Sequence, residues 1–440
     1  MAQGGRNGSP FPPMKLSRLV VLALILAPAI LRAQQPVPSG EFSRQQLTDE
    51  FWAEGASFGD FNRDGKMDIV YGQWWWEGPG FTKRHEYQHL EKSFTVKQPD
   101  GTEKTIQGFK GQYSADNEYS KNFFAYTHDF NGDGWTDILV LGFPGAESWW
   151  YENPKGSEGA WTQHVALEVT DNESPAFLDI TGDGQPEIVC GSQGYLGYAS
   201  YDPKNPAAKF QWHRVSPLVT VPGKDGKPAN FYQRFTHGLG VGDVNGDGRI
   251  DLLEKSGWWE QPASLAGDPE WKKHEAMFGG GGAQMYVYDV NGDGKNDVIT
   301  SLAAHGYGIA WFEQTSEGGA EGWTRHLIVG EKPAENPQGI AFSQPHAMAL
   351  IDMNGDGLKD LVTGKRFYAH GPHGDPEPTG TPYLYWFELK REGKNAKFLG
   401  HLIDDASGVG TQVVAGDVNG DGKPDVVVGN KRGAFVFLRK

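Results

Sequence analysis

The chain has 440 residues, a formal net charge of −16, 61 glycines, 27 prolines and an aromatic content of 12%. So much glycine and proline suits an all-β protein with many turns and disfavours long helices. The aromatic content excludes a disordered chain, and an acidic surface repels phosphate backbones, which argues against nucleic acid as a partner. The single cysteine, Cys190, excludes an internal disulfide framework and any CxxC zinc site.

Residues 14–33 have the pattern of a secretory signal. Lys15 and Arg18 precede an apolar stretch, and the segment ends on the small residue Ala33. The apolar stretch has about 12 residues, fewer than the roughly 20 that span a membrane, so we expect cleavage rather than anchoring. The sequence therefore predicts a secreted or periplasmic protein without a membrane span, whose signal is residues 1–33.

After the signal we expect a short linker over residues 34–40 and one domain over residues 41–440. The translation start is open between Met1 and Met14. The chain without its signal has 36 basic and 56 acidic residues, a formal charge of −20. An excess this large suggests bound cations.

Seven segments share the pattern D-x-[NT]-x-D-G-x-x-[DE]. Their first residues are Asp60, Asp129, Asp179, Asp243, Asp289, Asp352 and Asp417. Successive starts are 46 to 69 residues apart. A fixed motif with insertions of variable length is typical of a propeller or a solenoid.

Each segment offers oxygen ligands at positions 1, 3, 5 and 9, with glycine at position 6 for a sharp turn. This spacing suits Ca²⁺, which prefers six to eight oxygens. The expected ligands are Asp60, Asn62, Asp64, Asp68; Asp129, Asn131, Asp133, Asp137; Asp179, Thr181, Asp183, Glu187; Asp243, Asn245, Asp247, Asp251; Asp289, Asn291, Asp293, Asp297; Asp352, Asn354, Asp356, Asp360; and Asp417, Asn419, Asp421, Asp425. Up to seven Ca²⁺ ions would bring the charge from −20 to about −6, an ordinary value.

Two alternatives compete with these calcium loops. A metal-free Asn-Gly or Asp-Gly β-turn explains one such segment, but seven segments with a ninth-position carboxylate favour calcium. An EF-hand needs a glutamate at position 12, where the first two segments have Tyr71 and Val140. We expect the third loop to bind most weakly, because Thr181 and Glu187 replace asparagine and aspartate.

Short apolar and aromatic runs surround each loop in a fixed order. An apolar strand precedes the loop, and a β-branched strand, an aromatic strand and a segment with a histidine follow it. Four strands per repeat predict an all-β, seven-bladed β-propeller of four-stranded blades with calcium-binding loops. The last strand, residues 435–438, is the third of the seventh blade, and we expect residues 43–51 to supply the fourth.

The repeats resemble FG-GAP/VCBS repeats, which form the propeller of integrin α-subunits and of many secreted bacterial proteins. The resemblance covers residues 41–440 and implies calcium between the first and second strands of each blade. Residues 365–378 (KRFYAHGPHGDPEP) also resemble the propeller domain of aldos-2-ulose dehydratase and related sugar lyases. That second resemblance implies chemistry on a carbohydrate, although one fold hosts many functions.

Residues that recur in each blade are expected to be architectural. The aromatic strands should pack between blades, and six histidines recur in the segment after them: His85, His164, His213, His274, His326 and His401. Residues found in one blade are better candidates for chemistry. His237 and His346 lie six residues before a first aspartate, at the start of an inner strand, and Glu54 and Glu173 hold the same place in other blades.

These positions predict a polar funnel on the face opposite the calcium loops. The candidate residues are His237, His346, His305, Lys365, Arg366, His370 and Glu173. In one interpretation, His237 or His346 is a general base beside a carbonyl-activated sugar carbon, a second histidine is the acid, and Lys365 or Arg366 stabilises an enolate. In another, His237, His346 and Glu173 hold a transition metal.

Three function classes follow from the sequence. The first is a secreted, monomeric calcium-binding propeller that binds a carbohydrate or an extracellular protein on the funnel face. The alternative is a carbohydrate lyase or dehydratase with a His/Lys/Arg site in the funnel. The third is a scaffold, in which each histidine only satisfies a local hydrogen bond.

Overall fold

The computed structural model describes residues 38–89, 93–98, 101–107, 119–223, 226–315, 322–336 and 338–440. Residues Pro36–Lys440 form one unit. The expected signal, residues 1–33, lies outside the described residues. Within the described ranges, the helical segments are two 3-10 turns, η2 (Pro333–Glu335) and η3 (Gly371–His373), and no helix is long and apolar enough to cross a bilayer. The predicted all-β class is therefore confirmed.

Three of the described sheets have four strands. The first has the order β2 (Ala56–Gly59), β3 (Asp68–Tyr71), β4 (Trp74–Trp76), β5 (Arg84–Glu86). The second has the order β25 (Met348–Ile351), β26 (Asp360–Gly364), β27 (Leu384–Glu392), β28 (Asn395–Asp404). The third has the order β1 (Phe42–Thr48), β31 (Gly433–Arg439), β30 (Asp425–Asn430), β29 (Val413–Gly416). Neighbouring strands in all three sheets are antiparallel.

Two larger sheets join what would otherwise be four four-stranded units. A seven-stranded sheet has the order β14 (Gln211–Arg214), β13 (Tyr195–Ser200), β12 (Glu187–Ser192), β11 (Thr162–Leu178), β10 (Ala146–Glu152), β9 (Asp137–Gly142), β8 (Asn122–His128). An eight-stranded sheet has the order β20 (Lys272–Glu275), β19 (Gly257–Glu260), β18 (Asp251–Glu254), β17 (Leu239–Gly242), β21 (Gln284–Tyr288), β22 (Asp297–Ser301), β23 (Ile309–Gln314), β24 (Trp323–Val329).

The strand after the linker completes the sheet formed by the end of the chain. β1 pairs with β31 in antiparallel register, with Phe42 opposite Arg439 and Gln46 opposite Phe435. This pairing is the one that the sequence predicts for residues 43–51. It covers an edge of β31 whose backbone groups would otherwise be unpaired.

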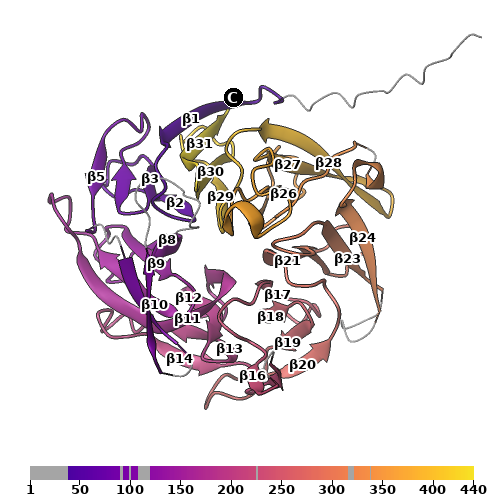
Figure 1. Cartoon of the computed structure of the whole chain (residues 1–440), viewed down its shortest axis with the longest axis horizontal. Helices are drawn as coiled ribbons and strands as arrows, with labels where there is room; N and C mark the ends of the chain where they lie inside the picture. The colour runs from indigo at the N-terminus through magenta and orange to yellow at the C-terminus, as the bar shows by residue number, and fades with distance from the viewer. Residues whose placement is uncertain are drawn as a thin grey trace, which may run out of the picture. The chain divides into compact units, whose positions relative to one another are not determined.

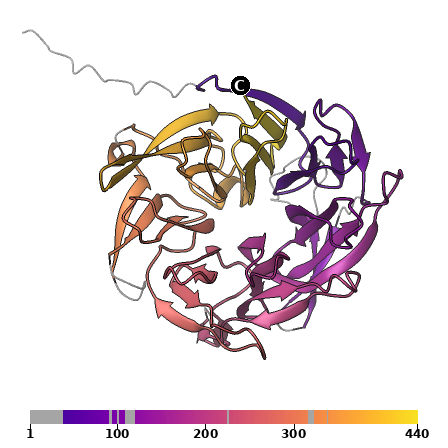
Figure 2. The ribbon, with the colours of Figure 1, turned by 180° about the vertical axis from the view of Figure 1, so that it is seen from behind.

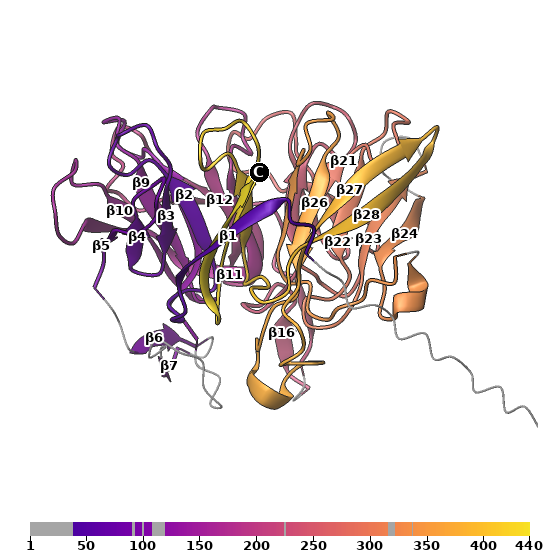
Figure 3. The same ribbon diagram turned by 90° about the horizontal axis from the view of Figure 1, so that it is seen from above.

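Within this unit the sheets follow one another around a common centre, as in a propeller (Figure 1 and Figure 2). Two further hairpins, β6 (Ser93–Lys97) with β7 (Glu103–Gln107) and β15 (Thr220–Pro222) with β16 (Pro228–Asn230), stand outside the main sheets. Figure 3 shows β6, β7 and β16 on the same side of the sheets.

Aromatic side chains fill the space between successive sheets. Trp150 and Trp258 are fully buried, and Phe130 contacts Trp150 in a cluster that also contains Ile188 from the next repeat. Cys190 lies in the same cluster and is fully buried, as expected of a small apolar residue. The recurrent histidines stack on the aromatic strands, for example His274 on Trp258 with centroids 4.1 Å apart. These residues therefore build the fold.

Candidate functional site

Four polar side chains from distant parts of the sequence converge at the ends of inner strands. Glu173 lies in β11, His237 precedes β17, His305 lies between β22 and β23, and His346 precedes β25. One potential ligand atom from each residue lies within 4.8 Å of the others. We call these four residues the His/Glu cluster. All four are among the candidates that the sequence identified.

The donor atoms of the His/Glu cluster have the spacing of a metal site. The distance between His305 Nε2 and His237 Nε2 is 3.1 Å. Glu173 Oε2 lies 3.5 Å from His237 Nε2 and 3.4 Å from His346 Nε2. Zinc-type ions bind nitrogen and oxygen at about 2.0–2.1 Å, which places the ligands of a tetrahedral centre about 3.4 Å from one another. The donor set and its spacing therefore fit a divalent transition-metal ion.

Backbone hydrogen bonds hold Glu173 beside His237. The Glu173 N–H donates to Thr236 O at 2.9 Å, and the Asn172 N–H donates to Arg234 O at 2.9 Å. β11 is irregular at this point, because its register against β12 shifts between Asp171 and Ala176. At this irregular point Glu173 leaves the pairing between β11 and β12, and its side chain lies beside His237.

A parallel strand pair brings His237 near His305. β17 and β21 pair in parallel, with Leu239 opposite Gln284. A Cβ atom on Gly240 would lie 2.1 Å from Met285 O, so only glycine permits this approach of the two strands. The pair merges two repeats into one sheet, and the two histidines come from opposite halves of that sheet.

Burial favours the neutral form of two imidazoles of the cluster, those of His346 and His305. His346 is completely buried, and this burial, together with the nearby Arg366 cation, holds its pKa well below the usual range. Burial likewise lowers the pKa of His305 to about 4. Neutral imidazole is the form that binds metals. Neither ring nitrogen of His346 makes a hydrogen bond to the described residues. A buried polar group without a hydrogen bond lowers the stability of the folded protein by about 1–3 kcal/mol.

A buried guanidinium lies behind the cluster. Arg366 Nη2 lies 3.0 Å from Glu54 Oε2, and Arg366 Nη1 lies 3.6 Å from Glu173 Oε2. Burial lowers the pKa of Arg366, but Glu54 and Glu173 outweigh burial, so the pKa is raised. Arg366 thus orients Glu173 and compensates part of its charge, as expected of a residue that supports a metal ligand.

Lys365, His370 and Asp375 form the remaining polar layer. Burial lowers the pKa of Lys365 to about 8, and its Nζ donates to Ser343 Oγ at 2.5 Å. The Asp375 carboxylate accepts a hydrogen bond from His370 Nδ1 at 3.0 Å and faces His305 Nδ1 at 3.5 Å. Burial raises the pKa of Asp375, but the two imidazoles outweigh burial and hold the pKa well below its usual range.

Asp375 is a site residue that the sequence analysis did not include among the funnel candidates. Its signal is its place in the segment KRFYAHGPHGDPEP, between two histidines and a proline-rich turn. A carboxylate that faces the second nitrogen of a metal-binding imidazole fixes the tautomer and the orientation of that ring. Asp375 is in this position relative to His305, and it also fixes His370 so that the Nε2 lone pair of His370 is available.

The seven acidic loops lie between the first and second strands of their repeats. In the second loop, the Asp133 N–H donates to Asp129 Oδ1 at 3.1 Å and to Asn131 Oδ1 at 3.0 Å. The Gly134 N–H donates to Asp129 Oδ2 at 2.8 Å. These bonds hold oxygen-bearing side chains around one turn. Asp133 Oδ2 is buried, accepts no hydrogen bond from the described residues, and pairs with Lys155 Nζ at 3.2 Å.

The ninth residue of the loop is buried and binds the backbone. Asp137 Oδ2 accepts from the Phe130 N–H at 2.9 Å, and Asp137 Oδ1 accepts from the Asn153 N–H at 2.8 Å. Burial, with the nearby Asp129 and Asp133, raises the pKa of Asp137 to about 7. The sequence predicted this residue only as a metal ligand, whereas the structure gives it a second task, which is to join the loop to the third strand.

The third loop gathers its carboxylates closely, while its expected weakest binding of calcium stays a prediction. Asp179, Asp183 and Glu187 bring carboxylate oxygens within 4.8 Å of one another, the one acidic loop grouped in this way among the described residues. Glu187 is longer than aspartate by one methylene, so Oε2 accepts from the Ile180 N–H while Oε1 reaches Thr181 Oγ1 at 3.4 Å. The substitutions that suggested a weak loop therefore produce a closely gathered one.

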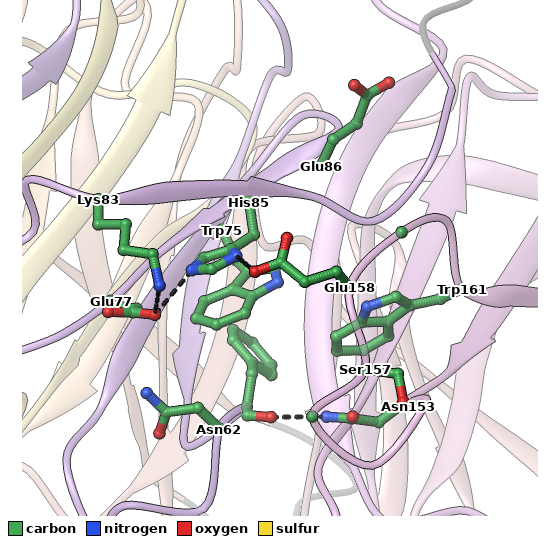
Figure 4. Close-up of a pocket in the computed structure, with 13 residues that line it drawn as sticks. Asn62, Trp75, Glu77, Lys83, His85, Glu86, Asn153, Ser157, Glu158 and Trp161 are labelled. Carbon is green, nitrogen blue, oxygen red and sulfur yellow. Dashed lines mark hydrogen bonds and ion pairs between the residues drawn. The ribbon is translucent and has the colours of Figure 1, made fainter.

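A separate cavity of about 140 Å³ lies beside the first acidic loop. Figure 4 shows Lys83 and His85 directed toward Glu77, with Trp75 and Trp161 on either side. Lys83 Nζ and His85 Nε2 both lie 2.7 Å from Glu77 Oε1, so these three groups of the cavity already pair with one another. The His/Glu cluster, with a buried imidazole that makes no hydrogen bond to the described residues, is the better candidate site.

The antiparallel sheets around a centre and the repeated acidic turns define an all-β repeat protein of the propeller class. The family model for the FG-GAP-like repeat matches residues 129–190, 289–363 and 352–428. The chain therefore carries FG-GAP-like repeats over these residues, which make up less than half of its length. It is similar to integrin alpha pat-2 of Caenorhabditis briggsae, with 28% identity over 224 residues, which is 45% of this chain and 16% of that integrin. The match thus spans about a sixth of the integrin.

Two solved structures match the chain at low sequence identity. The biofilm matrix protein Bap1 of V. cholerae has a TM-score of 0.38 and 11% identity, over 89% of this chain and 88% of that one. The rhamnogalacturonan lyase YesW has a TM-score of 0.39 and 14% identity, over 92% of this chain and 73% of that one.

Proposed function

We propose that this protein is a secreted, metal-dependent lyase or dehydratase that acts on a carbohydrate in the funnel of a calcium-stabilised propeller. The observation that carries the proposal is the convergence of Glu173, His237, His305 and His346 at the spacing of a tetrahedral metal centre. An adhesion surface or a scaffold has no need for a buried imidazole such as that of His346, whose ring nitrogens make no hydrogen bond to the described residues, because this costs stability.

The proposed propeller has seven blades. Blade one is β2–β5, blade six is β25–β28, and blade seven is β29–β31 with β1. The seven-stranded sheet supplies blades two and three, which share the 17-residue strand β11, and the eight-stranded sheet supplies blades four and five. This division gives each blade four strands and one acidic loop, which is what supports the count.

We also propose that the seven acidic loops bind Ca²⁺. Each loop gathers oxygen donors of the kind that calcium prefers. In the second loop the buried Asp133 Oδ2 has only a lysine as counter-charge. Secretion fits calcium binding, since the sequence carries a predicted signal over residues 1–33, which lies outside the described residues.

The residues of the funnel suit proton transfer beside a polarised oxygen. A divalent ion held by the His/Glu cluster would supply Lewis-acid polarisation of a substrate carbonyl or hydroxyl oxygen. His346 is too deeply buried to reach a substrate carbon, so the structure favours it as a ligand over the general-base role that the sequence allowed. His370 is 39% exposed, and Asp375 holds its Nδ1, so His370 Nε2 is the better general base.

An elimination needs only these groups and keeps atoms and electrons in balance. His370 takes the proton from the carbon next to the carbonyl, and the electron pair of that C–H bond becomes the new C=C bond. The C–O bond at the following carbon breaks, and its electron pair leaves with the oxygen, which takes the proton from His370 and departs as water or as a sugar hydroxyl. Lys365 and Arg366 are cationic and buried like His346, so they would favour negative charge in the funnel through their electric field and not by contact with the substrate.

A ligand-binding module is the second candidate, and one observation favours it. Two hairpins, β6–β7 and β15–β16, stand on one side of the sheets (Figure 3), and insertions of this kind often carry recognition. In that case the funnel face would bind a carbohydrate or an extracellular protein without chemistry.

Metal analysis combined with two variants tests the proposal. Wild-type protein dialysed against Zn²⁺ and then against buffer should retain one zinc ion per chain. His346→Ala should lose this ion, whereas His370→Ala should keep it. Incubation with a panel of acidic polysaccharides and sugar acids should yield an unsaturated product that absorbs in the ultraviolet, and both variants should lose it.

Three results lead to different conclusions. Retention of zinc without product from any sugar, combined with measurable sugar binding, would favour the binding module. Retention of zinc by His346→Ala would contradict the assignment of the ligands. A wild-type protein that retains no transition metal would overturn the proposal for the funnel and leave the calcium loops untouched.

A further inference from the structure

The third-position asparagines of the acidic loops fall into two groups by the acceptor of their side-chain amide. In blades two and five, Asn131 Nδ2 donates to Glu152 Oε1 at 3.2 Å, and Asn291 Nδ2 donates to Glu313 Oε1 at 3.1 Å. In blade six, Asn354 Nδ2 donates both to Glu388 Oε1 at 2.8 Å and to Asp356 Oδ2 of its own loop at 3.2 Å, so this loop combines the two arrangements. Each glutamate is the residue that follows the aromatic run of the third strand.

The glutamates of these blades are themselves held in place. The other carboxylate oxygen of Glu313 lies 2.7 Å from His326 Nε2, and the His326 ring stacks on Trp311 with centroids 4.2 Å apart. Blade two repeats the arrangement with His164 and Trp150. Blade six repeats it with His401 and Trp386. A buried tryptophan thus fixes a histidine, the histidine fixes a glutamate, and the glutamate fixes the loop amide.

Blades one, four and seven lack this connection. There the asparagine amide donates within its own loop: Asn62 to Asp64, Asn245 to Asp247 and Asn419 to Asp421, at 3.1 to 3.3 Å in each case. In blade four the equivalent glutamate, Glu260, pairs with Lys272 and His274 instead. The acceptor in each of these loops is Oδ2 of the fifth-position carboxylate, an oxygen that a cation in the loop would require.

We infer that Glu152 and Glu313 are positioning residues for calcium, and that loops two and five bind Ca²⁺ more tightly than loops one, four and seven. The inference rests on the proposed calcium sites. In all of these loops the asparagine Oδ1 accepts the backbone N–H of the fifth residue, at 3.0 Å in loops two and five and at 2.9 to 3.0 Å in loops one, four and seven. An amide has one oxygen and one NH₂ group, so the two groups of loops differ in the acceptor of that NH₂ group.

The contrast between the groups has a simple energetic origin. In loops one, four and seven, calcium must compete with the asparagine NH₂ group for Oδ2 of the fifth-position carboxylate. In loops two and five the asparagine amide has an acceptor outside the loop, so a binding ion does not have to break its hydrogen bond. Removal of residues that orient a metal ligand costs about 10- to 100-fold in affinity.

The test compares two equivalent glutamates in adjacent blades. Glu313→Ala removes the acceptor of Asn291, and Glu260→Ala removes a glutamate that also pairs with a stacked histidine but does not contact its loop asparagine. Calcium affinities of the full-length protein are measured by competition with a chromophoric chelator. We expect Glu313→Ala to weaken one of the tighter sites about tenfold or more, and Glu260→Ala to leave the tighter sites unchanged.

A milder variant keeps the inference testable if Glu313→Ala fails to fold. Glu313→Gln retains one oxygen acceptor at the same position, so it should give an intermediate loss. The melting temperature in EGTA monitors damage unrelated to calcium and should change similarly in Glu313→Ala and Glu260→Ala. Equal calcium affinities of these two variants would overturn the inference, whereas a wild-type protein that binds no calcium would refute the proposed calcium sites themselves.

Discussion

Substitution of one ninth-position carboxylate should change how stability depends on pH. Asp137 is fully buried, and its pKa is raised to about 7 in the folded protein, from 3.8 when it is solvated. The folded state therefore binds more protons than the unfolded state between these two values. The contribution of the Asp137 carboxyl group to the free energy of unfolding therefore increases as the pH falls through 7 and is lost as the pH rises.

The magnitude follows from the two pKa values. Between pH 7.5 and pH 5, a carboxyl group that titrates near 7 when folded and at 3.8 when unfolded adds about 2 kcal/mol to the free energy of unfolding. Asp137→Asn removes this titration. In EGTA, the wild type should therefore gain about 2 kcal/mol relative to the variant over this interval.

Urea unfolding at pH 7.5, 6 and 5 measures the effect. Asparagine also weakens the bonds to the Phe130 and Asn153 N–H groups, but this loss is the same at each pH and cancels in the comparison. Asp405→Asn, which changes an exposed carboxylate, is the matched control and should give curves parallel to the wild type. Parallel curves for Asp137→Asn as well would refute the reasoning.

Three further predictions concern the calcium loops, the merged sheet and the core. EGTA should lower the melting temperature of the wild type by many degrees, because calcium binds the folded loops and not the unfolded chain; a scan with and without calcium measures this. Gly240→Ala should weaken zinc retention at least tenfold while calcium binding persists. The new Cβ atom would lie 2.1 Å from Met285 O and force β17 away from β21. Equilibrium dialysis with zinc and with calcium measures the two effects separately. Trp258→Ala should cost about 3–5 kcal/mol in urea unfolding, since the side chain is fully buried.

The spacing of the sequence was sufficient to predict which side chains share the funnel. Glu173, His237 and His346 each lie six residues before a first aspartate, and this constant offset from the acidic loop places them at the same level of the fold, although β11 is far longer than β17 and β25. Arg366 links Glu54, the fourth residue at this offset, to Glu173. In this repeat protein, residues at the same offset from the acidic motif therefore occupy equivalent positions in successive repeats.

Other parts of the site depend on contacts between residues far apart in the sequence, which a local sequence pattern cannot predict. The parallel pairing of β17 with β21 and the 17-residue strand β11 join repeats that the sequence shows as separate. Asp375 reaches His305 only because the segment after β26 folds back through η3. The ninth-position carboxylates have a metal-ligand pattern in sequence, and their bonds to backbone N–H groups become visible only when the third strand is in place.

The merged sheet also has a mechanical consequence. His237 and His305 are carried by eight strands with continuous hydrogen bonds, and Glu173 is tied to the backbone beside His237, so these three side chains should move together. His346 precedes β25, whose sheet is separate. Relative movement of these two sheets would displace His346 from the other three residues. The boundary between the two sheets would then control how an ion enters or leaves the cluster.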